Sequence, residues 1–195
     1  MKKIENWETS ELAAQCIIPR LDVEKFFEDS EYKNEIINLV KDGIGGFCIF
    51  GGNCELAEKA TSYLQSIAEI PLIFAADFEN GLPMRLDDGT SFPHAMALGI
   101  ANDTKVTEEI AIAIAKEAKD IGVRWNLAPV CDINSNPKNP IINIRSFGQT
   151  SELVARHICA YIKGTQSETV ASTAKHFPGH GNTAIDSHIE LPIID

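Results

Sequence analysis

Short apolar runs alternate with longer amphipathic stretches along the whole chain. The runs are too short and too continuous for surface helices, and runs of this kind suit strands buried on both faces of a parallel sheet. The pattern therefore predicts five buried strands. They are AAQCIIP (13–19), GGFCIF (45–50), PLIFAAD (71–77), VRWNLAPV (123–130) and VASTAKHF (170–177).

Between these runs, apolar residues recur at helical spacing. Proline and glycine at their ends stop a helix, and Asp, Ser or Thr at their starts cap one. The alternation of strands and helices favours an α/β fold with a parallel sheet and right-handed crossovers. The helical segments are 24–43, which stops at Gly43; 54–70, before Pro71; 103–122, from Asp103 to Gly122; and 150–164, from Thr150 or Ser151 to Gly164.

Two α/β architectures fit this order, a doubly wound open sheet and a (β/α)8 barrel. The doubly wound sheet lacks its phosphate-binding fingerprint, because GIGGFCIFGG flanks a strand and does not open a helix. A complete barrel needs about 250 residues and eight strands. The pattern leaves both architectures open, and it also predicts a functional loop with a short turn region over residues 78–102.

Composition narrows the functional classes. The formal net charge of −11 argues against nucleic acid as a partner. No apolar run is long enough for a secretory signal or a membrane span, which favours a cytoplasmic protein. The odd number of cysteines without a CxxC pair indicates reduced thiols and argues against structural zinc. The cysteines are Cys16, Cys48, Cys54, Cys131 and Cys159.

Polar side chains follow the third, fourth and fifth predicted strands. Because the carboxyl ends of parallel strands meet at one end of a barrel, these residues are candidates for a common site. Simpler interpretations remain open: Asp77 could cap a turn, and Arg145 could form a structural ion pair with Asp132. The candidates are Asp77, Glu79 and Arg85; Asp132, Asn134, Asn136, Asn143 and Arg145; and Lys175, His176, His180, Asp186 and His188.

The segment KHFPGHGNTAIDSHIELP (175–192) holds three of the five histidines. Asp186 and His188 are two residues apart in a loop rich in Gly, Pro, Asn and Ser. If the backbone bends, the carboxylate accepts a hydrogen bond from one ring nitrogen and leaves the other free, which makes a general acid/base unit. A metal site and a plain solvated loop are the alternatives, and the spacing matches no HxxxH or HExxH metal motif.

Three segments together resemble glycoside hydrolase family 3, in its β-N-acetylhexosaminidase branch. KHFPGHGNTAIDSH, NLAPVCDINSNPKNPIINIRSFG and ADFENGLPMRL are similar to signatures of that family and occur in the family's order. The resemblance covers nearly the whole chain. It implies that residues 1–195 form part of a (β/α)8 barrel, with about five β/α units present and strands six to eight missing.

The resemblance also implies an activity and a set of site residues. Family members release β-linked N-acetylglucosamine with retention, some from peptidoglycan fragments, and no cofactor or metal is implied. Carried over, His188 is the acid/base and Asp186 orients it. The residues that would contact the sugar are Asp77, Arg85, Arg145, Lys175 and His176, whereas His180 stays without an assigned role.

The family nucleophile is an aspartate after the seventh strand and has no counterpart in this sequence. We therefore expect the 195-residue chain alone to be inactive and to self-associate through open barrel edges. A non-catalytic sugar-binding or assembly module is the alternative from another functional class. Phosphorolysis is a closer variant, because a histidine acid/base does not repel phosphate as a carboxylate would.

Overall fold

A computed structural model describes residues 4–193, and its centre is a parallel five-stranded sheet. The strands are β1 (Arg20–Asp22), β2 (Gly46–Phe50), β3 (Ile73–Ala76), β4 (Trp125–Asn126) and β5 (Ala171–Ser172). Each strand pairs with the next strand of the chain, in the order β1-β2-β3-β4-β5. A doubly wound sheet reverses its strand order part-way, whereas a barrel wall does not. The fold is therefore part of a (β/α)8 barrel.

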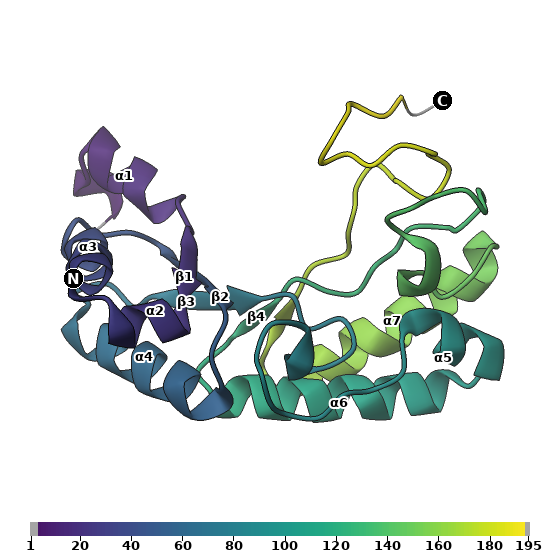
Figure 1. The fold of residues 1–195 in the computed structure, drawn as a ribbon, viewed down its shortest axis with the longest axis horizontal. Coiled ribbons are helices and arrows are strands. Elements are labelled where there is room, and N and C mark those ends of the chain that lie inside the picture. The colour runs from purple at the N-terminus through teal and green to yellow at the C-terminus, as the bar shows by residue number, and fades with distance from the viewer. Residues whose placement is uncertain (1–3, 194–195) are drawn as a thin grey trace.

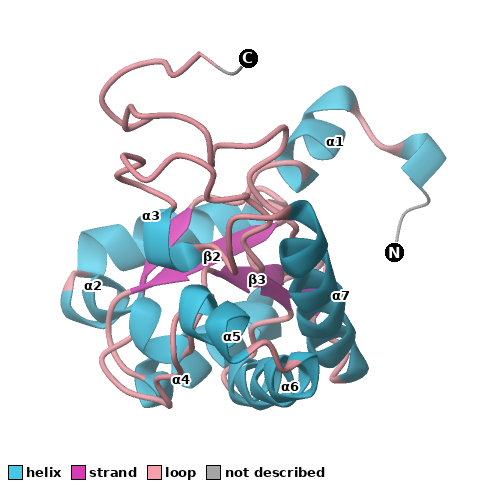
Figure 2. Cartoon of the chain, turned by 90° about the vertical axis from the view of Figure 1, so that its right-hand side faces the viewer, coloured by secondary structure: helices cyan, strands magenta, loops and turns pink. Residues whose placement is uncertain are grey.

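Most helices pack along the outer side of this sheet, while the loops and the first helix, residues 9–15, rise on the opposite side (Figures 1 and 2). The helices α6 and α7 make the most extensive contact between two elements. The α-helices are α1 (Thr9–Gln15), α2 (Val23–Glu28), α3 (Ser30–Lys41), α4 (Cys54–Ile67), α5 (Ala95–Ala101), α6 (Thr104–Asp120) and α7 (Ser151–Ser167); short 3-10 turns are η1 (Ile4–Asn6), η2 (Leu82–Met84) and η3 (Asn143–Arg145).

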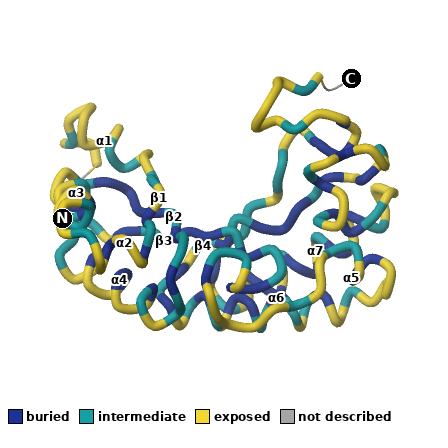
Figure 3. Tube along the Cα trace, viewed as in Figure 1, coloured by how far each residue is buried: buried dark blue, intermediate teal, exposed yellow. Residues whose placement is uncertain are grey.

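The hydrophobic core lies between the sheet and its helices. Leu21, Phe47, Ile49 and Phe74 point to that side and are buried. Phe50, next to Ile49 on the opposite face of β2, is only partly buried. Figure 3 shows the buried centre of the sheet and the largely exposed segment that follows β5. The alternation along β2 reflects a strand whose two faces meet different surroundings.

The first predicted strand was wrong. Residues 13–15 end helix α1, and strand β1 begins only at Arg20. The reason is local: Glu8 and Glu11 form a capping box, and the Leu and Ala residues that follow favour a helix. The other four predicted runs each contain a strand, β2 to β5.

The predicted helices differ from the observed ones at particular residues. Residues 24–43 form two helices, because Asp29 has an extended backbone and caps α3 through Glu31 and Tyr32. Gly164 does not end α7, which continues to Ser167. A Cβ on Gly164 would lie 2.5 Å from the Glu108 carbonyl oxygen on α6, so this glycine permits close helix packing. The caps Asp103 and Thr150 are confirmed.

Candidate active site

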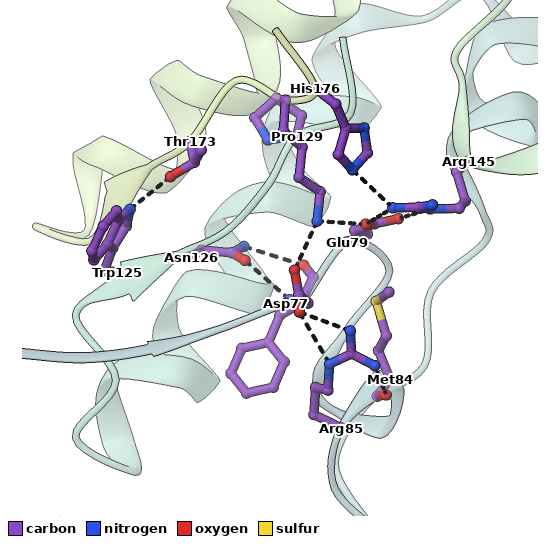
Figure 4. A network of polar contacts seen from close by, with 12 residues as sticks. Asp77, Glu79, Met84, Arg85, Trp125, Asn126, Pro129, Arg145, Thr173 and His176 are labelled. Carbon is purple, nitrogen blue, oxygen red and sulfur yellow. Dashed lines mark hydrogen bonds and ion pairs between the residues drawn. The ribbon is translucent and has the colours of Figure 1, made fainter. Parts of the chain in front are cut away.

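Asp77 and Lys175 bring the carboxyl ends of β3 and β5 together. Lys175 Nζ donates to Asp77 Oδ1 at 2.8 Å. Arg85, just after η2, donates to Asp77 Oδ2 from Nη2 at 2.7 Å and from Nε at 3.2 Å. Figure 4 shows the Arg85 guanidinium directed at the Asp77 carboxylate. Three predicted sugar-contacting residues therefore form one cluster.

The Phe50 ring at the end of β2 supports Arg85 from another side. Arg85 Cζ lies 4.9 Å from the ring centroid, and Arg20 Cζ lies 4.7 Å from it. Both distances are within the range of cation–π contacts. Arg20 is in turn paired with Asp22, with Nη2 and Oδ2 3.0 Å apart. Arg85 is thus held by a carboxylate at one edge and by an aromatic face.

Glu79 is a central residue of the site, and the sequence analysis listed it as a candidate but gave it no role in sugar contact. Arg145 donates to it twice, from Nε at 3.0 Å and from Nη2 at 2.8 Å. Lys175 Nζ lies 2.7 Å from the same carboxylate, whose side chain is only 10% exposed. Lys175 therefore bridges Asp77 and Glu79. The sequence signal was the position of Glu79 two residues after Asp77, beyond the same strand.

Asn126 on β4 holds the backbone between these two carboxylates. Its Oδ1 accepts from the Phe78 N–H at 3.0 Å, and its Nδ2 donates to the Phe78 carbonyl at 3.2 Å. The Tyr161 hydroxyl of α7 donates to the same carbonyl at 2.8 Å. Asn126 is fully buried, so both of its polar atoms have the partners that burial requires. This arrangement fixes Asp77 and Glu79 on either side of Phe78.

His176 has a carboxylate partner of its own, Asp132. The Nδ1 of His176 lies 2.6 Å from Asp132 Oδ2, and its Nε2 lies 3.4 Å from Arg145 Nη2. The sequence left open an ion pair between Arg145 and Asp132. The structure instead pairs Arg145 with Glu79 and Asp132 with His176. That interpretation of Arg145 was wrong.

Asp186 and His188 meet as the loop bends. The Nδ1 of His188 lies 2.8 Å from Asp186 Oδ1, and the His188 backbone N–H donates to the same oxygen at 2.9 Å. An ionised carboxylate only accepts, so the ring carries a proton on Nδ1. The His188 side chain is 80% exposed, and its Nε2 has no hydrogen-bond partner among residues 4–193. That nitrogen is therefore available for proton transfer.

The described residues enclose a cavity of about 570 Å³ at this end of the sheet. Six of the seven predicted site residues line it, and the seventh, Asp186, binds His188. Its polar lining is mainly cations and imidazoles, while Asp77 supplies a carboxylate. The residues that line the cavity are Asp77, Met84, Arg85, Leu127, Ile141, Arg145, Thr173, Lys175, His176, His180, Ser187 and His188.

The ion pairs shift the titration of the partly buried acids of the site. Burial raises the pKa of Asp77, but hydrogen bonds from Lys175 and Arg85 outweigh it and bring the pKa below its ordinary value. For Glu79, burial is likewise outweighed, by Arg145 and Lys175, and its pKa is lowered. The hydrogen bond to Glu79 raises the pKa of Arg145. All three groups are therefore charged near neutral pH.

The family comparison matches nearly the whole chain. The family described as "Glycosyl hydrolase family 3 N terminal domain" matches residues 11–195. The chain belongs to glycoside hydrolase family 3. The family's N-terminal domain is a barrel-like α/β fold, in agreement with the sheet order.

Individual family 3 proteins are similar to this chain in sequence and in structure. Beta-hexosaminidase A of Pseudoalteromonas piscicida is 39% identical over 166 residues, which cover 78% of this chain and 28% of that protein. The solved family 3 β-N-acetylglucosaminidase of Paenibacillus sp. str. FPU-7 superposes with a TM-score of 0.85 at 35% identity, over 95% of this chain and 36% of that one. The β-glucoside phosphorylase BglX superposes with a TM-score of 0.80 at 26% identity, over 94% of this chain and 31% of that one. This family 3 chain thus spans about a third of each of these relatives.

Within the described part, residues 4–193, no group of three or more His, Cys, Asp or Glu side chains is arranged to hold a metal ion. None of the helices over the same residues is both long enough and apolar enough to cross a membrane.

Proposed function

We propose that this chain carries the acid/base pair and the sugar contacts of a retaining β-N-acetylglucosaminidase. The observation that carries the proposal is the Asp186–His188 pair beside a cavity lined by hydrogen-bonding cations. The names of the relatives, β-hexosaminidase A and β-N-acetylglucosaminidase, support the class of sugar. The substrate would be a terminal β-linked N-acetylglucosamine, including that of peptidoglycan fragments.

The charged cluster suits a neutral ring rich in hydroxyls. Each hydroxyl both donates and accepts, and the cluster offers both kinds of partner. Asp77 would accept from sugar hydroxyls, while Arg85, Lys175 and Arg145 would donate to them. Hydrogen bonds with a charged partner are about twice as strong as neutral ones. His176 completes this set at the Arg145 side.

In the proposed reaction, a nucleophilic carboxylate attacks the anomeric carbon and forms a glycosyl-enzyme bond. The bond to the glycosidic oxygen breaks at the same time, and the His188 imidazolium gives its Nε2 proton to that oxygen. Asp186 holds Nδ1–H throughout and stabilises the charged ring. In the second half, the neutral ring takes a proton from the water that releases the sugar, which restores the imidazolium. A retaining mechanism requires this change from acid to base.

We further propose that the nucleophile comes from outside the sequence given. The carboxylates of Asp77 and Glu79 are each bound by two cations, which favours a binding role for them. Accordingly, the 195-residue chain alone would bind N-acetylglucosamine without hydrolysing a glycoside.

The free thiols of all five cysteines support a reducing, cytoplasmic compartment.

The test compares the longer gene product that contains this chain with two variants, on a chromogenic β-N-acetylglucosaminide. We expect His188→Gln and Asp186→Asn to lower kcat by about 10²- to 10⁴-fold, the range for a positioned acid/base. Calorimetric binding of N-acetylglucosamine should survive in both. Undiminished turnover by His188→Gln contradicts the proposal, and binding without any turnover by the longer protein favours a sugar-binding module instead.

A phosphorolytic reaction is the second candidate, supported by the likeness to a β-glucoside phosphorylase. The neutral form of His188 carries no negative charge that would repel an incoming phosphate. The assay above, run with and without inorganic phosphate, distinguishes the two reactions. Release of a sugar 1-phosphate indicates phosphorolysis, and release of the free sugar alone indicates hydrolysis.

A further inference from the structure

Asp132 is a fully buried carboxylate shared by two residues of the loop after β5. Its side chain is 0% exposed. Oδ2 lies 2.6 Å from His176 Nδ1 and accepts from the His176 N–H at 3.3 Å. Oδ1 accepts from the backbone N–H of His180 at 2.6 Å. Both oxygens are thus committed to donors, and all three donors belong to the stretch that precedes the acid/base pair.

The state of the His176 ring follows from these partners. An ionised carboxylate has no proton to donate, so His176 Nδ1 must carry one. Arg145 Nη2, 3.4 Å from Nε2, is also only a donor. A neutral ring with its proton on Nδ1 satisfies both neighbours, because Nε2 then presents a lone pair. A free imidazole in water prefers the opposite tautomer, so the protein must impose this one.

The site therefore contains two histidine–carboxylate pairs in different surroundings. His188, with an exposed ring and an Nε2 that has no partner in the described part of the chain, suits proton transfer. His176 rests on a buried carboxylate through Nδ1 and faces a guanidinium at Nε2, and the guanidinium opposes a proton on Nε2. The side chains around each ring thus decide which ring donates and which accepts.

We propose that Asp132 is a positioning residue, which fixes His176 as the Nδ1–H tautomer so that its Nε2 accepts a hydrogen bond from a sugar hydroxyl. The consequence for sugar binding rests on the proposed function, whereas the tautomer does not. Asp132 also ties the start of the loop that carries His188. It touches neither the acid/base ring nor the cavity directly, and it acts through His176.

The loop has other ties, so a variant of Asp132 should still fold. Asn139 Nδ2 donates to the His180 carbonyl at 2.6 Å, and the Asn136 N–H donates to the Gly181 carbonyl at 3.2 Å. Asn136 Nδ2 also donates to the Asn182 carbonyl at 3.0 Å. These bonds connect the β4 loop to the β5 loop without Asp132. A substitution that removes the charge of Asp132 should therefore leave the loops after β4 and β5 connected.

The experiment is long-range ¹H–¹⁵N spectroscopy of the imidazoles in the ¹⁵N-histidine-labelled chain near pH 7.5. A His176→Gln variant assigns the His176 signals among the five histidines. In the unsubstituted chain we expect the shift pattern of an Nδ1–H tautomer at His176. A pattern typical of Nε2–H overturns the proposal, and this measurement requires no variant of Asp132 to fold.

Asp132→Asn then tests the cause. The asparagine amide has one acceptor oxygen, whereas the carboxylate has two. The His180 backbone N–H can only donate, so it should keep that oxygen as its partner. The amide NH₂ should therefore face His176 and move the ring proton to Nε2. N-Acetylglucosamine binding should weaken about tenfold or more, because His176 Nε2 would no longer accept a hydrogen bond. A tenfold change corresponds to about 1.4 kcal/mol.

Asp186→Asn is the matched control, because it makes the same substitution in the other pair and should leave the His176 tautomer unchanged. If Asp132→Asn only lowers thermal stability while the tautomer and the affinity stay as they were, Asp132 is merely structural and the proposal is overturned. If the unsubstituted chain shows the tautomer but binds no N-acetylglucosamine, the proposed function fails and the tautomer assignment stands.

Discussion

Glu79 and Arg145 are joined by two parallel hydrogen bonds, of 3.0 and 2.8 Å, across 66 residues of sequence. The pair connects the loop after β3 with the turn η3 in the loop after β4. Lys175, after β5, reaches the same carboxylate at 2.7 Å. One side chain therefore holds three loops of the sheet in a fixed relation, and its removal should affect both stability and binding.

We predict that Glu79→Gln lowers the free energy of unfolding by about 3 kcal/mol, the range for breaking a largely buried pair. The amide leaves Arg145 and Lys175 without their shared negative partner. Urea denaturation followed by circular dichroism measures the change. Glu55→Gln, in the exposed pair with Lys59, is the control and should change the free energy of unfolding much less, because solvent screens an exposed pair. Equal effects of the two substitutions would contradict the role given to Glu79.

Phe50→Leu should weaken N-acetylglucosamine binding a few-fold, because Arg85 loses its aromatic support. A cation–π contact at a partly exposed site contributes about 0.5–1 kcal/mol, and leucine keeps most of the apolar volume. Titration calorimetry gives the affinity. Phe27→Leu, on α2 and away from the cavity, should leave it unchanged. An unaltered affinity in Phe50→Leu would mean that Asp77 alone suffices to hold Arg85.

Gly99→Ala should destabilise the chain strongly. A Cβ at this helical position would lie 1.6 Å from the Phe147 carbonyl oxygen and 2.7 Å from its carbon, so the backbone after η3 must move. Overpacking of this kind costs about 1–3 kcal/mol. The melting temperature should fall, whereas Ile100→Ala, one residue further and 80% exposed, should change it little. A normal melting temperature for Gly99→Ala would show that α5 can shift freely.

We predict that the buried ring of His157 makes the folded chain less stable as the pH falls. Its ring is buried, stacks on Phe147 at 5.2 Å and meets Thr107 Oγ1 at 2.8 Å. Burial lowers its pKa, followed by the positive charge of Arg156. Because the folded pKa lies below the unfolded value near 6.5, the unfolded chain binds the proton first. This contribution to stability is complete above the unfolded pKa near 6.5, and it is lost as the pH falls from there toward the folded pKa.

The measurement is the free energy of unfolding at several pH values below about 7. One proton taken up only by the unfolded chain corresponds to a slope of about 1.4 kcal/mol per pH unit. His157→Gln should reduce the slope by that amount at most, and His94→Gln, at an exposed position before α5, should retain it. An identical slope in the unsubstituted chain and His157→Gln would contradict the prediction.

Local patterns in the sequence predicted much of the fold. Four of the five apolar runs contain strands, because a strand of a parallel sheet that packs against helices needs apolar residues whatever its neighbours are. The caps Asp103 and Thr150 lie where their side chains satisfy free backbone N–H groups at a helix start. Where the pattern misled, in residues 13–19, helix-forming residues and a capping box competed with the apolar run.

The sequence by itself determined which chemical groups follow each strand, and the resemblance of its motifs indicated the family before any contact was known. Only the tertiary structure decided the pairing among these groups. Glu79 with Arg145 and Asp132 with His176 are contacts across 66 and 44 residues, and no local spacing encodes them. The physical reason is that the order and register of parallel strands set which carboxyl ends are neighbours, and burial then requires each charged group to find an opposite partner.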